Sequence, residues 1–462
     1  GTALISHCTI SGNRAARWGG GVAATYNAWT TLDKCLITGN TADVNGSGAS
    51  YYMGGEGDGA LTITNSTIAN NTAPAGAAAL YTNWPIHVTV RNSILWADIP
   101  TGQIAWEGEW ATVSAEYCDI QGGYEGAGNI SADPMFVDGD FHLSVGSPCI
   151  NAGAGEVAND PDGSPPDLGA FYFDLTGYVW GDLAGTWTRA NSPYRVAAPV
   201  SVPYMSTLTI EPGVEVLFDA DVPFVVEGSL QALGETGEGN GIRFVPGVAP
   251  EWGGLVFMGI DGPGGRTASP ALERPAGVSG EGSSTILYAE ISGGDADDLS
   301  ETSGPMGVMG GGVSVFGTSV DIANSRIHNN QAMFGGGLAA FQGGIMLNSC
   351  VVENNVANAG LGGGFVAIYG GLMATDTEFR SNSAADTTGT FVGAGGGGGY
   401  AEESYAVFER CRFTGNTSAG NGGGVMLAND PVYGPPMEFT HCLFAGNTSA
   451  AGGGAYATVP MQ

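Results

Sequence analysis

The sequence is poor in positive charge. Its 462 residues include 13 Lys and Arg against 45 Asp and Glu, a formal net charge of −32, and Lys34 is the only lysine. Nucleic acids and anionic lipid surfaces are bound mainly through Lys and Arg. The composition therefore predicts no nucleic-acid partner, and it favours divalent cations as counterions.

Long apolar runs are also missing. No stretch approaches the roughly 18–20 apolar residues that span a bilayer, so we expect no transmembrane segment. The sequence starts with Gly1 and shows no signal peptide. We expect either that a leader has been removed or that the chain is a segment of something longer. Hydrophobic residues make up 43%, which argues against wholesale disorder.

Glycine is present in excess. The 80 glycines follow no three-residue period, which excludes a collagen helix. Many stand in blocks that belong to a longer repeat: a small anchor residue, an apolar residue two positions later, and Asn (in three repeats Asp or Gly) five positions later. Neighbouring anchors lie 25 to 36 residues apart within each of two runs. The anchors are Cys8, Cys35, Ser66, Ser93 and Cys118, then Ala289, Ser325, Cys350, Thr377, Cys411 and Cys442.

A repeat near 27 residues accommodates about three short strands and three turns, which is one coil of a parallel β-helix. One coil cannot bury its inner face alone, so stacked coils supply the core. The sequence thus predicts an all-β solenoid whose apolar column points inward and stacks at about 4.8 Å per coil. The residue before each anchor is mostly polar and is expected to face outward, so His7 and His441 are interpreted as surface residues, not catalytic bases.

The Asn column suits an inward-facing amide ladder at a turn, where each side chain bonds the one above it. The glycine blocks suit turns that need positive φ and close backbone approach. Both columns are interpreted as structural. The predicted ladder comprises Asn13, Asn40, Asn71, Asn330, Asn355, Asn382, Asn416 and Asn447.

Phe379, Phe413 and Phe444 are each followed three residues later by Asn and then by a glycine block. This pattern resembles the repeats of polymorphic outer-membrane proteins and related bacterial right-handed β-helix proteins, and such repeats cover about two thirds of the chain. The resemblance implies a right-handed parallel β-helix in an adhesin or passenger domain. It also implies an extracellular or cell-surface location in a bacterium.

Residues 133–174 resemble a second kind of module. Phe141-His142-Leu143, SPCINAG from Ser147 and DLGAF from Asp167 are similar to the choice-of-anchor type module that often closes bacterial β-helices ahead of a surface-anchoring signal. Here the chain continues, and alternating strands return from about Val200. We predict the C-terminal coils of a first β-helix at 1–132, the closing module at 133–174, a linker leading into the second helix at 175–199, and an open-ended second β-helix at 200–462.

Both ends of the sequence fall inside a coil, and uncapped β-helix ends expose strand edges that can pair with another chain. Because Cys442 lies 20 residues before the last residue, a head-to-tail junction would place the next Cys8 28 positions onward, within the native spacing. Two interpretations stay open: a flanking β-helix in a longer chain, or self-stacking into filaments. The expected assembly interface comprises Thr2, Leu4, Ile5, Cys8, Ile10, Cys442, Phe444, Tyr456 and Val459.

Two acidic turns are candidate calcium sites, since Ca²⁺ prefers several hard oxygens around a turn. The alternatives are a turn rich in Asp and Pro that bonds its own backbone, and a solvated loop. The candidate ligands are Asp160, Asp162 and Asp167 in the first turn, and Asp295, Asp297 and Asp298 in the second.

An enzyme of the pectate-lyase-like fold is the alternative function. Such enzymes use calcium-binding acids with a basic residue on one face, or paired carboxylates for hydrolysis. Arg326 and Arg412 stand one position after an anchor and Arg380 three positions after, so they need not face the same way. No Asp pair recurs beside them. We therefore predict no catalytic residue, and the arrangement to look for is a groove with acids and Arg on one external face.

Aromatic and thiol side chains leave further alternatives open. Exposed Trp18, Trp29, Trp106 or Trp110 could stack on cell-surface glycans, and packing against loops is the alternative. Six of the seven cysteines share the anchor column and are interpreted as small core residues. Adjacent-coil spacing is compatible with a Cys8–Cys35 or Cys411–Cys442 disulfide but does not require one.

These observations together predict an extracellular structural or adhesive β-helix, possessing no catalytic centre, that can stack head to tail. A calcium-dependent polysaccharide lyase or glycoside hydrolase of the same fold is the alternative.

Overall fold

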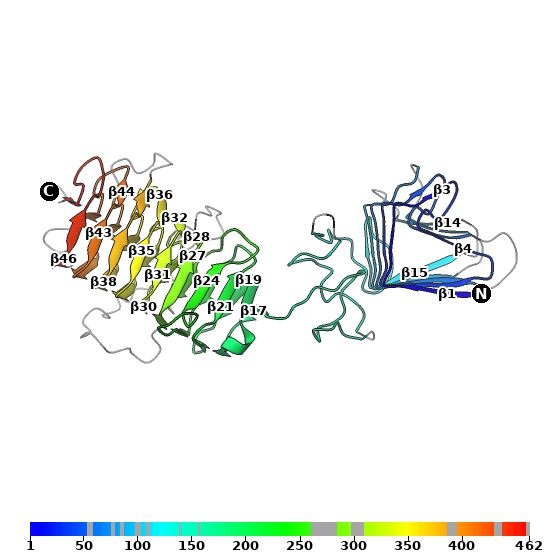
Figure 1. The fold of residues 1–462 in the computed structure, drawn as a ribbon, viewed down its shortest axis with the longest axis horizontal. Coiled ribbons are helices and arrows are strands. Elements are labelled where there is room, and N and C mark those ends of the chain that lie inside the picture. Colours follow the sequence, from blue (N-terminus) through cyan, green and yellow to red (C-terminus); the bar gives the residue numbers. More distant parts are fainter. Residues whose placement is uncertain are drawn as a thin grey trace. The chain divides into compact units, whose positions relative to one another are not determined.

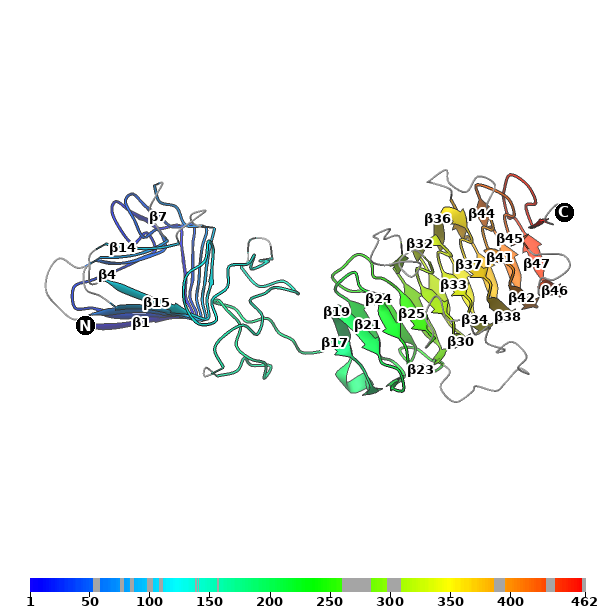
Figure 2. The same ribbon diagram turned by 180° about the vertical axis from the view of Figure 1, so that it is seen from behind.

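A computed structural model describes residues 1–52, 59–74, 79–83, 87–97, 103–107, 111–137, 139, 141–155, 158–259, 284–296, 309–385, 395–428 and 437–458. The chain divides into two compact units, Gly1–Thr176 and Gly177–Gln462. Each unit contains a stack of parallel strands, in which a strand pairs with the equivalent strand of the coil before and the coil after (Figures 1 and 2).

The described residues of the first unit form three long parallel sheets and one short one. One sheet consists of β1 (Thr2–Ser6), β5 (Trp29–Asp33), β9 (Ala60–Thr64), β12 (His87–Arg91) and β15 (Thr112–Glu116). The second consists of β2 (Thr9–Ser11), β6 (Leu36–Thr38), β10 (Thr67–Ala69), β13 (Ile94–Trp96) and β16 (Asp119–Ile120). The third consists of β4 (Val22–Thr25), β8 (Ala49–Tyr52), β11 (Leu80–Asn83) and β14 (Ile104–Glu107), and β3 (Arg14–Ala15) pairs with β7 (Thr41–Ala42).

The second unit repeats this plan over more coils. Its nine-stranded sheet consists of β18 (Gly185–Trp187), β20 (Thr207–Ile210), β23 (Ser229–Leu233), β26 (Ser284–Leu287), β30 (Ser319–Ala323), β34 (Gly344–Asn348), β38 (Gly371–Thr375), β42 (Tyr405–Glu409) and β46 (Met437–Thr440). A five-stranded sheet consists of β28 (Asp295–Ala296), β32 (Gln331–Phe334), β36 (Val356–Leu361), β40 (Ser383–Ala384) and β44 (Thr417–Ser418).

An 18-stranded sheet begins with β17 (Tyr178–Asp182) and β19 (Tyr194–Val202), between which lies a short 3-10 helix, Arg189–Asn191. Its strands then belong to two columns. The first is β21 (Glu215–Phe218), β24 (Ile242–Pro246), β27 (Ala289–Ser292), β31 (Arg326–His328), β35 (Val351–Glu353), β39 (Glu378–Arg380), β43 (Arg412–Thr414) and β47 (Leu443–Ala445). The second is β22 (Phe224–Val226), β25 (Leu255–Met258), β29 (Val313–Phe316), β33 (Leu338–Phe341), β37 (Phe365–Ile368), β41 (Gly399–Glu402), β45 (Val425–Ala428) and β48 (Ala455–Thr458).

These sheets confirm the prediction of an all-β parallel solenoid. The segment predicted as a linker at 175–199 differs in one respect, because β17, β18 and the first half of β19 already pair with later strands of the second unit. The strand at Val200 is therefore not the first of the second helix. Sequence periodicity missed these strands because each carries turn residues, such as Gly181 and Gly185 at positive φ.

Two left-handed residues bracket the short strand that follows each anchor. The residue before the anchor has positive φ, as at Lys34 (52°) and Ser349 (55°). The residue four positions after the anchor also has positive φ, as at Asn354 (53°). Each left-handed residue reverses the chain direction sharply, which leaves room for only three residues of strand between the two turns. Asn and Gly tolerate this conformation best, which explains why they recur at these positions.

The glycine blocks meet two separate demands. Gly335, the first of its block, has a φ of +66°. A Cβ on the next residue, Gly336, would lie 2.3 Å from Val356 O in the following coil. The first glycine thus provides the turn, and the second permits close approach of adjacent coils.

The interior contains two stacks that run from coil to coil. In the Asn column, Asn382 Nδ2 donates to Asn416 Oδ1 (3.0 Å) and to Val352 O (2.9 Å), and its Oδ1 accepts from both nitrogens of Asn355 (3.1 and 3.0 Å). The same pattern joins Asn13 to Asn40 and Asn40 to Asn71. Beside this column Phe413 stacks on Phe379 and on Phe444 at centroid distances of 4.9 and 4.8 Å.

Residues 133–174 pack along the side of the first unit's strands. Leu143, Cys149 and Leu168 form an apolar cluster with Ile94, an outward residue of β13. Gly169 N donates to Asn92 O (2.9 Å) and Ala170 N donates to Thr67 Oγ1 (3.0 Å). This lateral packing buries Asn92, which the sequence pattern predicts to face outward with the other residues that precede an anchor.

Candidate functional site: an outward charge ladder and a lateral cleft

The strands that follow the anchors present their first and third residues outward, because the middle residue points into the core. In the second unit these outward positions are charged over consecutive coils. The residues are Glu215, Arg243, Glu290, Arg326, His328, Glu353, Glu378, Arg380 and Arg412, here called the charge ladder.

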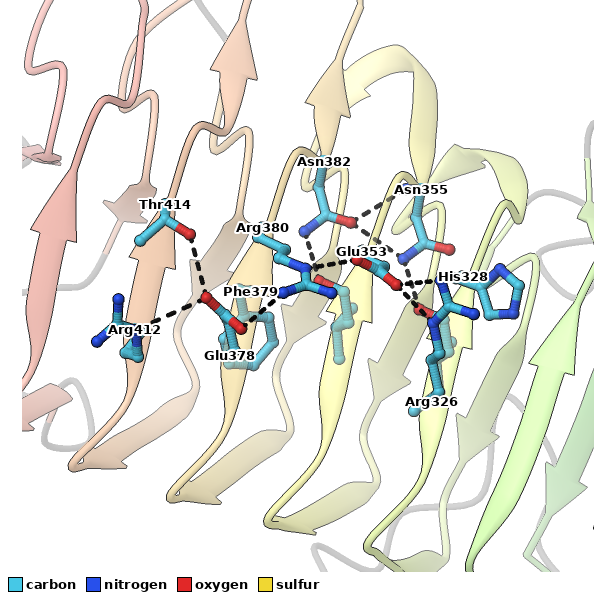
Figure 3. Close-up of polar contacts among 12 residues, drawn as sticks. Arg326, His328, Glu353, Asn355, Glu378, Phe379, Arg380, Asn382, Arg412 and Thr414 are labelled. Carbon is cyan, nitrogen blue, oxygen red and sulfur yellow. Dashed lines mark hydrogen bonds and ion pairs between the residues drawn. The ribbon is translucent and has the colours of Figure 1, made fainter. Parts of the chain in front are cut away.

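Glu353 occupies the middle of the charge ladder. Its side chain is 6% exposed, and its two oxygens lie 2.5 Å from Arg326 Nη2 and 2.5 Å from Arg380 Nε (Figure 3). Burial would raise the pKa of Glu353, but the hydrogen bonds from Arg380 and Arg326 outweigh burial and lower it. The carboxylate is therefore held in its ionised form between two arginines.

The charge ladder continues toward β43. Glu378 accepts from Arg380 Nη1 at 3.1 Å and from Thr414 Oγ1 at 3.4 Å, and it lies 3.6 Å from Arg412 Nε (Figure 3). Arg380 thus joins two carboxylates, one on its own strand and one on β35. Alternating charges at the spacing of adjacent strands can interact across every coil boundary.

In the other direction the charge ladder includes a buried histidine. Asn329 Nδ2 donates to His328 Nδ1 (2.9 Å), so His328 Nε2 carries the hydrogen that it donates to Glu290 Oε1 (2.9 Å). Arg243 pairs with Glu290 and with Glu215. Burial would raise the pKa of Glu290, but its bonds from His328 and Arg243 lower it instead.

The strand register corrects one sequence expectation. Arg326, Arg380 and Arg412, which need not face the same way by sequence position, all project from the outer face of one sheet (Figure 3). The first and third residues of so short a strand both flank an inward residue, which is why they share a face. Arg410, by contrast, precedes its anchor and pairs with Asp376 and Glu409.

Sequence reasoning noted the arginines but missed their acidic partners. Apart from Arg380 with Glu378 on one strand, the paired groups are 27 to 47 residues apart along the chain, for example Arg380 with Glu353 and Arg243 with Glu290. The signal available was the recurrence of Glu and Arg one and three positions after the anchor. Only the alignment of coils of unequal length reveals which acid meets which base.

A second candidate site lies in the first unit, beside the predicted closing module. A cleft of about 610 Å³ is lined by His7, Lys34 and Asn65 on one side, and by His142, Phe171 and Tyr172 among others on the opposite side. Asp160 and Asp167 also line it. No sequence motif indicates this cleft, because its walls are far apart in the chain.

The candidate calcium ligands of the first acidic turn are bonded to their own backbone. Asp167 accepts from Asn151 N and Phe173 N, both at 2.6 Å, and Asp160 Oδ2 accepts from Asp167 N at 2.9 Å. Asp162 accepts from Ser164 and Leu175. Such bonding matches the turn alternative.

In the second acidic turn, Asp295 Oδ2 accepts from Gln331 Nε2 at 2.5 Å. Asp297 and Asp298 lie outside the described residues. Within the part of the chain that the structure describes, no group of three or more His, Cys, Asp or Glu side chains is arranged to hold a metal ion. Calcium binding stays a prediction.

The predicted assembly residues lie at the two outermost coils. Thr2, Leu4 and Cys8 are exposed, and Leu4 shows 68% of its surface. Val459 lies outside the described residues. Those that are half-buried are Ile5, Ile10, Cys442, Phe444 and Tyr456.

Cysteine and tryptophan side chains lie as follows. All seven cysteines are free, and five of them are buried. Trp18 stacks on Tyr52 at 4.1 Å, whereas Trp29 and Trp106 are about half exposed. Trp110 lies outside the described residues.

Residues 1–114 and 282–458 match the family described as the right-handed β-helix region. The chain belongs to this family. The match covers more than half of the sequence and agrees with the parallel strand order, so this right-handed β-helix protein has the predicted fold and hand. No curated protein and no solved structure matches the chain. The family includes enzymes and non-enzymes and does not by itself assign an activity.

No helix among the described residues of this β-helix protein is long and apolar enough to cross a membrane.

Proposed function

We propose that this β-helix protein is an extracellular structural or adhesive element of a bacterial surface, whose function depends on stiffness and repeated surface and not on a catalytic centre. The observation that carries the proposal is the charge ladder. Every charged side chain in it has an opposite partner on the same or a neighbouring coil.

Pairing of this kind suits stiffening better than catalysis. A general acid or base must exchange a proton with substrate near the working pH. The pKa values of Glu353 and Glu290 are lowered by their cationic partners, and the pKa of Arg380 is raised by its bonds to Glu353. The pKa of each group is therefore moved further from the working pH, which makes proton exchange with a substrate harder. The pairs meanwhile link successive coils.

The test is a turnover assay on purified chain with acidic and neutral polysaccharides, with calcium or with chelator. Product is followed by new reducing ends and by the ultraviolet absorbance of unsaturated sugars. We expect no turnover above that of a Glu353→Gln variant. Turnover that needs calcium and disappears in Arg380→Met would contradict the structural role.

The second candidate function, a calcium-dependent polysaccharide lyase or glycoside hydrolase, is favoured by one observation. Glu353, Arg326 and Arg380 lie on one external face, which is the arrangement such an enzyme needs (Figure 3). A substrate would have to displace an arginine from Glu353. The same turnover assay separates the two functions.

Head-to-tail assembly belongs to the same proposal. β1 pairs only with β5 among the described strands, so its other edge is available for a further strand. A filament would place a second copy, or a flanking β-helix of a longer chain, at this edge. Negative-stain microscopy with calcium and with chelator tests this, and single short rods in both conditions at high concentration would refute self-stacking.

A further inference from the structure

The cleft of the first unit has one wall built from the coil stack. His7, Lys34 and Asn65 are the left-handed residues that precede three successive anchors, with φ of 53°, 52° and 47°. Their backbone amides donate to the next coil, His7 N to Asp33 O (2.9 Å) and Lys34 N to Thr64 O (3.1 Å). The three side chains thus project in a row at the spacing of adjacent strands, about 4.8 Å.

The opposite wall is an aromatic surface. His142 stacks on Phe171 with ring centroids 4.2 Å apart, and Tyr172 is 44% exposed. Bonds on both sides fix this segment, since Ala170 N donates to Thr67 Oγ1 of β10 and Phe173 N donates to Asp167 Oδ2. The cleft is therefore preformed, with a volume of about 610 Å³ that lies in the range of small-ligand sites.

The charges in the cleft are unusual for this protein. Lys34 is the only lysine in a chain of net charge −32, and two of the five histidines accompany it. Lys34 Nζ makes no side-chain hydrogen bond or ion pair within the described residues. Burial raises the pKa of Asp160, and the nearby Lys34 charge offsets part of that rise. The lining therefore contains this one lysine beside the two carboxylates of Asp160 and Asp167.

The carboxylates of the cleft are already used. Asp167 accepts two backbone amides and is 6% exposed, and Asp160 Oδ2 accepts the amide of Asp167. The groups left to meet a ligand are the Lys34 ammonium, the imidazoles and the aromatic faces, because Asn65 already donates to Asp33 Oδ1 and accepts from Asn92 Nδ2. These recognise an anionic group attached to a ring with an apolar face.

We propose that this cleft binds an acidic saccharide, with the sugar carboxylate on Lys34 and the apolar face of a sugar ring on Tyr172. The choice of a saccharide rests on the proposed surface role, whereas the choice of a carboxylate rests on the cleft alone. The binding site is distinct from the charge ladder, which lies in the other unit.

The test uses the full chain and two probes, a trigalacturonate and the neutral galactotriose of the same length. Titration calorimetry is run on the wild type, Lys34→Met, Tyr172→Ala and Arg14→Met. Arg14 is the matched control because it is an exposed cation of the same unit, 72% accessible and paired with Asp43 outside the cleft. Lys34→Met should weaken trigalacturonate binding about tenfold or more, as expected for a lost bond to a charged group.

Tyr172→Ala should weaken binding of the acidic probe severalfold, and Arg14→Met should leave it unchanged. Reductive ¹³C-methylation gives an independent readout that needs no variant, because only Lys34 and the N-terminal amine carry the label. The Lys34 signal should shift with trigalacturonate and the N-terminal signal should not.

Three outcomes would overturn the inference: equal binding of both probes, weakening by Arg14→Met as strong as by Lys34→Met, or Lys34-dependent binding to anionic lipid vesicles without binding of trigalacturonate. In the first case the protein does not recognise the sugar carboxylate, and in the second the saccharide is bound outside the cleft. The proposed surface role survives in both. Failure of the surface role appears separately, as polysaccharide turnover in the assay of the charge ladder.

Discussion

Replacing Asn382 by Ala tests whether the interior amide ladder stabilises the solenoid. Asn382 is fully buried and takes part in four side-chain hydrogen bonds, two donated by Asn355 and two donated from its own Nδ2 to Val352 O and Asn416 Oδ1. Alanine removes all four. The amide N–H and one side-chain N–H of Asn355 then lack their acceptor, and Val352 O loses one donor.

The expected loss follows from the two orphaned N–H groups of Asn355. Each buried unpaired polar group costs about 1–3 kcal/mol. Because the space left by the side chain is small and the coils can shift slightly, we take the lower part of the range and expect a loss of about 2–4 kcal/mol in the free energy of unfolding of the second unit. Asn348→Ala is the matched control, since Asn348 is exposed, and should change that free energy by about 0.5 kcal/mol or less.

The assay is urea unfolding combined with hydrogen exchange resolved by mass spectrometry. Solenoids behave as chains of neighbouring coils, so exchange should accelerate most at the coil of Asn355 and its neighbours. Asn382→Asp gives a further check, because it keeps the acceptor for Asn355 but places an oxygen against Val352 O and Asn416 Oδ1. A loss in Asn382→Ala no larger than in Asn348→Ala would refute the ladder as a source of stability.

Three other measurements address the charge ladder, the first unit and the thiols. Glu353→Gln should cost about 1–2 kcal/mol in the second unit, since both arginine partners can rehydrate. It should also reduce, but not remove, the acid sensitivity that lowered carboxylate pKa values confer below about pH 4.5, because the pKa of Glu290 is lowered too; thermal melting follows both effects. Burial raises the pKa of Asp119 to about 6, above its unfolded value. Lowering the pH from about 7 to about 5 should therefore increase the free energy of unfolding of the first unit by on the order of 1 kcal/mol, and Asp119→Asn should flatten this dependence. A thiol reagent should modify Cys8 first in the native protein, because the Cys8 side chain is exposed. Cys118 and Cys411 should react slowly, because burial raises the pKa of each thiol to about 12. Fast modification of all seven thiols would contradict the buried anchor column.

The interior was accessible from sequence because it obeys a simple rule. Residues at fixed offsets from each anchor stack on their equivalents, so the Asn and Phe columns can be written down without knowing how long the intervening loops are. Asn382 bonds Asn416 although 34 residues separate them, and Asn355 bonds Asn382 over 27. Loop length has no effect on which side chains meet inside.

The cleft could not be predicted in the same way. Its walls depend on where residues 133–174 return to the coil stack, as in the bond between Ala170 and Thr67, which are 103 residues apart. No periodicity specifies such a contact. The resemblance of DLGAF to a known module marked the segment, but not the side of the helix on which it packs.

A comparison of the two units shows that the sequence does indicate which side of the coil stack another segment covers. The first outward position after the anchor is uncharged at Thr67 and Ile94, which residues 133–174 cover and which are each 1% exposed. At Asp119 it carries a buried carboxylate that accepts from Ala132 N and Cys149 Sγ. The equivalent position carries Glu290, Arg326 or Glu378 in the second unit. The change from uncharged to charged residues in this column between the two units therefore indicates whether another segment covers it. The reason is that a charge buried there would need a bonding partner. The charge ladder is thus the form that this face takes where none of the described segments covers it, which is why its acids and arginines pair with one another along the stack.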